Sequence, residues 1–123
     1  MAACLLIAFA VTAVSAAEMV IEVKNPFKAG NTAFPAGKYR ISTGRGAMDR
    51  NIVIRNLDKG SDAVVPYITR LSPRDENKGS VVFDSTDGQY FLAEVYFGKE
   101  DGFHLQGAPG NHTHVKAIAG ESK

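Results

Sequence analysis

Three histidines in the last twenty residues of the chain, His104, His112 and His114, have types and spacing that suit metal chemistry. His112 and His114 are two positions apart, so on a β-strand both imidazoles project from one face. Such a pair can ligate zinc, copper or nickel, with His104, Asp101 or Glu100 as the third ligand. The same residues also fit a polar tail with solvated histidines, so the sequence leaves these two alternatives open.

Carboxylates gather around the last expected hairpin, where Asp84 and Asp87 are interpreted as turn residues. Glu94 interrupts an apolar strand, and simple alternation places it on one face with Tyr90, Leu92 and Tyr96. A glycosidase would need two carboxylates about 5–10 Å apart across a cleft. The chain also lacks a G-x-S-x-G elbow and any triad spacing. We therefore predict no catalytic residue, no organic cofactor and no enzymatic activity.

Four tyrosines form a second candidate site: Tyr39, Tyr67, Tyr90 and Tyr96. On strands they could build an aromatic face that stacks on sugar rings or docks a protein partner. The alternative is that they belong to the core of the domain.

Composition indicates one globular domain, because hydrophobic residues make up 45% and charged residues 22% of 123 residues. The net charge of +1 and the scattered basic residues argue against binding to nucleic acid or an anionic membrane. The single cysteine, Cys4, excludes a disulfide framework.

Residues 1–17 are predicted to be a cleavable signal peptide. They carry no charged side chain, and Val14-Ser15-Ala16 fits the small-x-small cleavage rule. The basic n-region of a signal peptide is incomplete here. A retained anchor is the alternative, but residues 2–17 as a helix would span only roughly 24 Å of a ~30 Å hydrocarbon core. We expect export to the periplasm or the extracellular space, with membrane contact only if this segment is retained.

Period-two alternation and frequent turn residues after Glu18 predict an all-β domain over 18–98, followed by a Gly- and His-containing tail over 99–123 with one short strand. We expect a single antiparallel β-sandwich or small barrel of six or seven strands. Pro66 should place the strand over 63–71 at an edge, and the apolar strand over 89–97 should be central.

The segment Phe34-Pro35-Ala36-Gly37-Lys38-Tyr39-Arg40-Ile41 resembles the (L/F)PAGxYxI element of small exported bacterial β-proteins of uncharacterised function. The early Pro26-Phe27 and the late aromatic strand over 89–97 fit the same pattern. The turn is also similar to one in prealbumin-like sandwich modules. The resemblance implies a β-fold and brings no catalytic residue.

Together these observations predict an exported, non-enzymatic binding or structural module whose partner is a protein, a glycan or another copy of itself. Two alternatives stay open. One is an extracellular subunit that assembles into an oligomer or filament through β-strand edges, for which the unguarded strand over 19–24 is suited. The other is a divalent-metal-binding protein that uses the histidine tail.

Overall fold

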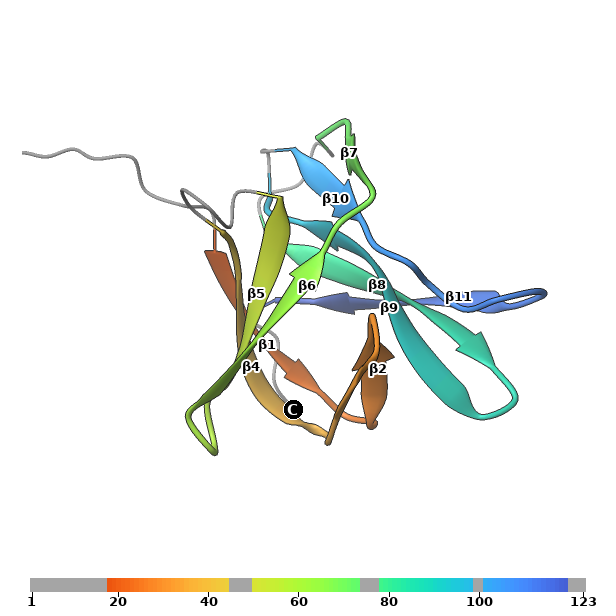
Figure 1. The fold of residues 1–123 in the computed structure, drawn as a ribbon, viewed down its shortest axis with the longest axis horizontal. Helices are drawn as coiled ribbons and strands as arrows, with labels where there is room; N and C mark the ends of the chain where they lie inside the picture. Colours follow the sequence, from red (N-terminus) through yellow and green to blue (C-terminus); the bar gives the residue numbers. More distant parts are fainter. Residues whose placement is uncertain (1–17, 45–49, 74–77, 99–100, 120–123) are drawn as a thin grey trace, which may run out of the picture.

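The computed structural model describes residues 18–44, 50–73, 78–98 and 101–119 (Figure 1). The predicted signal segment 1–17, with Cys4, lies outside these residues, so export stays a prediction. All regular elements within the described ranges are strands, which confirms the all-β prediction. These ranges also contain no helix of the length and hydropathy that a membrane span requires.

The described residues form eleven strands, more than the six or seven expected. Several have only three residues, too few for alternation to reveal them in the sequence. Their bounds are β1 Glu18–Val23, β2 Phe27–Ala29, β3 Thr32–Phe34, β4 Gly37–Thr43, β5 Asn51–Asn56, β6 Ser61–Pro66, β7 Thr69–Leu71, β8 Ser80–Thr86, β9 Gln89–Tyr96, β10 Gly102–His104 and β11 Thr113–Ile118.

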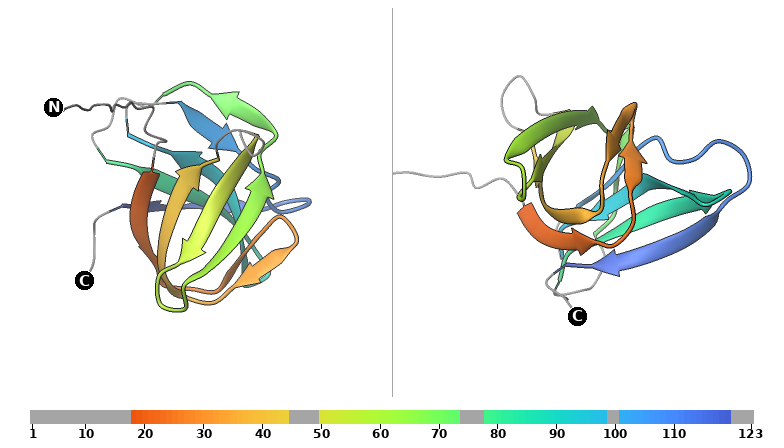
Figure 2. Two further views of the ribbon diagram at one scale, coloured as in Figure 1. Left: turned by 60° about the vertical axis from the view of Figure 1, so that its left-hand side comes forward. Right: turned by 90° about the horizontal axis from the view of Figure 1, so that it is seen from below.

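The strands form two sheets that are not closed into a barrel (Figure 2). The first has the order β1-β4-β5-β6, and all its pairs are antiparallel. The second has the order β11-β8-β9-β10-β7, and the β2–β3 hairpin joins it through a parallel contact between β2 and β9. β9 therefore lies inside its sheet, as predicted. The residues after Gly98 contribute two strands, β10 and β11, to this same sheet.

Pro66 marks the point where the chain passes from one sheet to the other. The single strand expected over 63–71 is divided into β6, at an edge of the first sheet, and β7, at an edge of the second. The Ile68 amide donates to the His104 carbonyl at 2.7 Å, which ties the crossing to β10. Because proline has no amide hydrogen, this strand can end at an edge without leaving a donor unpaired.

The apolar faces of both sheets meet in one core. Alternation puts these side chains inside, as in β1, where every second residue is buried. Aromatic rings fill the space near β2, where Phe27 stacks on Phe34 at 4.9 Å and meets Phe83 edge-on at 5.4 Å. The largest fully buried side chains are Tyr39, Ile21, Ile41, Ile52, Ile54, Leu92 and Leu105.

The turn over 34–37 directs Tyr39 into this core, where its side chain is fully buried. The Tyr39 hydroxyl donates to the Pro35 carbonyl, and the Asn56 side-chain amide contacts the same hydroxyl at 3.5 Å. The side-chain oxygen Oδ1 of Asn56 in turn accepts a hydrogen bond from the backbone amide of Asp58 at 2.9 Å. Burial, and secondarily the charge of Asp58, raise the pKa of the Tyr39 phenol above its ordinary value. One tyrosine thus links the turn before β4 to the turn after β5.

We predict that Tyr39→Phe lowers the free energy of unfolding by about 1–2 kcal/mol, because the Pro35 carbonyl loses its donor. The folded state also opposes ionisation of Tyr39, so wild-type stability should fall as pH rises above about 10, and the variant should lack this contribution. Urea denaturation as a function of pH measures both effects. Tyr90→Phe, at a partly exposed position, is the control and should change stability by less than about 0.5 kcal/mol. Equal stability of Tyr39→Phe and wild type would contradict the proposed role of the hydroxyl.

Candidate metal centre

Asp84 lies within β8 and is buried, with only 5% of its surface exposed. This corrects the sequence interpretation of Asp84 as a turn residue. The β8–β9 turn is instead formed by Asp87 and Gly88, both with positive φ, as a tight hairpin turn requires. Asp84 therefore lies in the second sheet at a buried position, where a carboxylate must be compensated by other polar groups.

The two carboxylate oxygens of Asp84 have different surroundings. Oδ2 accepts a hydrogen bond from the Ala108 amide at 3.0 Å, so the segment between β10 and β11 holds it in place. Oδ1 is buried and has no hydrogen-bond partner among the described residues. An unsatisfied buried oxygen of this kind is rare in native proteins, and an ordered water or an ion is a usual partner for it.

Gly107 allows the segment between β10 and β11 to lie close to the Asp84 carboxylate. A Cβ atom added at Gly107 would lie 1.9 Å from Asp84 Oδ2 and 3.1 Å from the Ala93 Cβ. Any side chain at this position would therefore push the carboxylate away. The glycine explains how the loop can cover Asp84 so closely.

His114 and His112 face the unpartnered oxygen. His114 lies directly opposite Asp84 in the β11–β8 register, so both side chains project from the same face of the sheet. The Nε2 atoms of His114 and His112 lie 3.5 Å and 3.4 Å from Asp84 Oδ1. Neither contact has hydrogen-bond geometry. The His112 and His114 ring centroids are 5.1 Å apart, although only His114 belongs to β11 and His112 lies in the loop before it.

A backbone contact sets the orientation of the His112 ring. Its Nδ1 lies 2.9 Å from the Gly110 carbonyl oxygen, which can only accept, so Nδ1 carries the hydrogen. In neutral His112, Nε2 then presents a lone pair to Asp84 Oδ1. A cation between the two atoms would interact favourably with both. A backbone carbonyl that orients a ligating imidazole through its other nitrogen is a recurrent feature of protein metal sites.

The two distances from Asp84 Oδ1 to the imidazole nitrogens are compatible with a tetrahedral ion. With bonds of about 2.0–2.2 Å to zinc, neighbouring ligand atoms of a tetrahedron are about 3.3–3.5 Å apart. The two Nε2–Oδ1 separations of 3.4 and 3.5 Å match this value. The three ligand atoms all lie within 4.8 Å of one another. A single metal ion can contact all three, whereas one proton can serve only one nitrogen.

The other predicted ligands are elsewhere. His104 lies on β10, paired with Glu94 and Thr69, and does not belong to this group. Asp101 is 3.6 Å from Arg70, and Glu100 lies outside the described residues. The residue that lies with His112 and His114 in this candidate group is Asp84, which sequence reasoning missed. A carboxylate inside the apolar run Val81-Val82-Phe83-Asp84 was the signal that could have found it.

The four tyrosines do not form one aromatic face. Tyr39 is fully buried in the core, and Tyr67 packs against Phe103 with ring centroids 4.7 Å apart. Tyr90 lies near the opening between the sheets, whereas Tyr96 is buried and donates to Glu94 at 2.6 Å.

Glu94 does not share a face with Leu92, because the strand carries an irregularity. The β8–β9 register shifts between Val82 and Phe83, so Glu94 opposes Val82 while Leu92 opposes Phe83. Since Val82 and Phe83 are neighbours in β8, they project from opposite faces. This bulge corrects the simple alternation expected over 89–97.

Comparison with protein-family models, curated proteins and solved structures gives no match. The resemblance to exported bacterial β-proteins therefore stays a prediction from the residues of the early turn and the aromatic strand. The feature of this chain that suggests a function is the position of the Asp84 carboxylate beside His112 and His114.

We predict that Gly107→Ala destabilises the fold by about 1–3 kcal/mol, because its Cβ overlaps the Asp84 carboxylate. Thermal or urea denaturation measures the change. Gln106→Ala, at the exposed neighbouring position, is the matched control and should change stability by less than about 0.5 kcal/mol. If Gly107→Ala is as stable as the control, the loop does not lie over Asp84 as described.

Proposed function

We propose that this chain is an exported, non-enzymatic binding module that holds one divalent transition-metal ion through Asp84 Oδ1, His112 Nε2 and His114 Nε2. The observation that carries the proposal is the buried, unpartnered Asp84 oxygen facing two imidazole nitrogens at 3.4 and 3.5 Å.

The ligand set selects the class of metal. Two imidazoles and one carboxylate suit zinc, copper(II) or nickel(II), whereas calcium and magnesium prefer oxygen ligands throughout. Among these ions a site of this kind binds copper(II) most tightly, by the Irving–Williams order. The tetrahedral spacing fits zinc, so zinc is the first ion to test.

The exposure of the histidines supports a site with open coordination. The side chain of His114 is 63% exposed and that of His112 is 27% exposed, while that of Asp84 is 7% exposed. Asp84 would therefore hold the ion from the buried side, and the two imidazoles would hold it from the exposed side. The remaining position faces solvent and can hold water or an exchangeable ligand.

A bound ion would also fasten β11 to the body of the sheet. His112 and His114 belong to the last loop and the edge strand, whereas Asp84 belongs to the interior strand β8. The metal would therefore stabilise the folded state by mass action, because the unfolded chain does not bring these residues together.

A salt bridge without metal is the competing explanation, in which a protonated histidine neutralises Asp84. The two explanations differ in what zinc does. A metal site gives saturable 1:1 binding and a rise in melting temperature that a chelator reverses. A salt bridge alone gives neither.

We predict that zinc binds the wild-type chain with one ion per chain at neutral pH. Asp84→Asn, His112→Ala and His114→Ala should each weaken binding at least about tenfold, because the first replaces a charged carboxylate by a neutral amide and each of the others removes a ligand nitrogen. Isothermal titration calorimetry with zinc gives the affinities, and thermal denaturation with zinc or a chelator gives the linked stabilisation.

His104→Ala is the matched control, because it removes a histidine outside the site and should leave affinity within about twofold. Retained wild-type affinity in Asp84→Asn and in the double variant His112→Ala/His114→Ala would overturn the proposal.

A further inference from the structure

The edge strand β1 has a charge pattern that fits a second copy of itself. β1 lies at the end of the first sheet and, within the described residues, pairs only with β4. Its outward face carries Glu18, Val20 and Glu22, followed by Lys24 just beyond the strand. A strand edge with unpaired backbone groups is a template for another strand.

The other sheet edges are less suited to such pairing. β6 ends at Pro66, which has no amide hydrogen, and β7 has only three residues. At β11, the exposed His114 belongs to the proposed metal site. β1 has six residues and contains neither a proline nor a residue of the proposed metal site.

We propose that two copies pair antiparallel along β1, around a two-fold axis through Ile21. In an antiparallel pair, directly opposite side chains lie on the same face of the sheet. A residue can therefore oppose only residues separated from it by an even number of positions. This condition leaves two long registers for a symmetric pair, one centred on Val20 and one on Ile21.

Charge decides between these registers. Centring on Val20 opposes Glu18 to Glu22 of the other copy, twice by symmetry, and like charges directly opposite are destabilising. Centring on Ile21 opposes Glu18 to Lys24 twice and places Val20 beside the aliphatic stem of Glu22. The buried face then aligns Met19 with Val23 and Ile21 with Ile21. Only this register combines matched charges with matched apolar faces.

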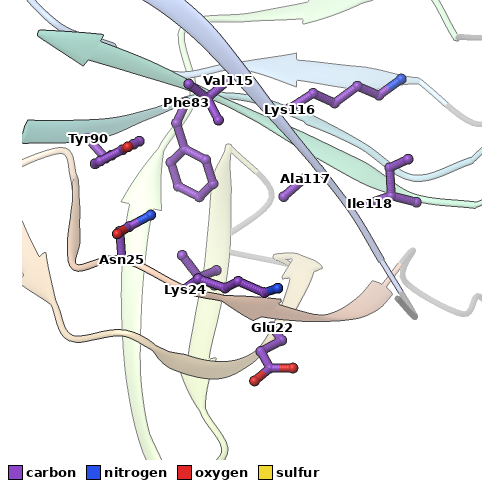
Figure 3. A pocket seen from close by; sticks show the side chains of 10 residues that line it. Glu22, Lys24, Asn25, Phe83, Tyr90, Val115, Lys116, Ala117 and Ile118 are labelled. Carbon is purple, nitrogen blue, oxygen red and sulfur yellow. The ribbon is translucent and has the colours of Figure 1, made fainter. Parts of the chain in front are cut away.

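An opening beside β1 gives the added strand an apolar surface to cover. A cavity of about 310 Å³ lies between the end of β1 and β11, lined by Val23, Val115 and Ala117, with Phe83 and Tyr90. Figure 3 shows Phe83 pointing into the space between the two strands. A strand paired to β1 would run along this opening, and burial of the exposed apolar groups would favour the dimer.

Charge exchange tests the proposal, with sedimentation velocity as the readout. Wild type should sediment as a concentration-dependent dimer. In Glu18→Lys each introduced lysine would lie opposite Lys24 of the other copy, and in Lys24→Glu each introduced glutamate would lie opposite Glu18 of the other copy. Each single variant should therefore weaken dimerisation about tenfold. The double variant Glu18→Lys/Lys24→Glu restores opposite charges and should recover the wild-type dimer.

Lys59→Glu, at the exposed β5–β6 turn, makes the same charge change as Lys24→Glu and should leave dimerisation unchanged. A chelator present throughout prevents metal bridging between copies, so the result does not depend on the metal site. A monomeric wild type, open-ended oligomers, or a double variant as weak as the single ones would each overturn the proposal.

Discussion

Strand β8 is covered on both of its faces. Its inner face packs on the shared core through Val81 and Phe83, and its outer face lies under the loop that follows β10. All five residues from Ser80 to Asp84 are consequently buried. A polar group on such a strand cannot reach bulk water and must be compensated by the protein. The loop does so at only one oxygen of Asp84.

The half-satisfied carboxylate connects the fold to the proposed chemistry. The Ala108 amide and Gly107 hold Asp84 at one oxygen, which leaves the other aimed at two imidazoles. A cation at that point would compensate the carboxylate and join the last strand to the sheet. The described residues contain no disulfide. A metal link would join the peripheral strand β11 to β8 and close the long stretch of chain between them, which would stabilise the folded state.

Local patterns predicted much of the fold. Alternation identified the strands over 19–24 and 38–42, because one face of each is buried and the other is exposed. Pro66 indicated an edge, and the apolar run over 89–97 indicated a central strand. The three-residue strands were missed because they are too short for alternation to reveal them. The bulge near Glu94 was missed because it is a shift of register between β8 and β9, which side-chain alternation in one strand does not show.

The period of two residues along the chain was sufficient to predict an all-β domain, whereas the proximity of His112 and His114 also depends on the loop in which His112 lies. Tertiary structure alone decided that Asp84 is the third member of the site. Its partners are 28 and 30 residues away, and the β11–β8 register brings them together. It also decided the strand order, which places β1 and β6 at the two edges of the first sheet. Strand order and register arise from packing the whole chain, so no local pattern encodes them.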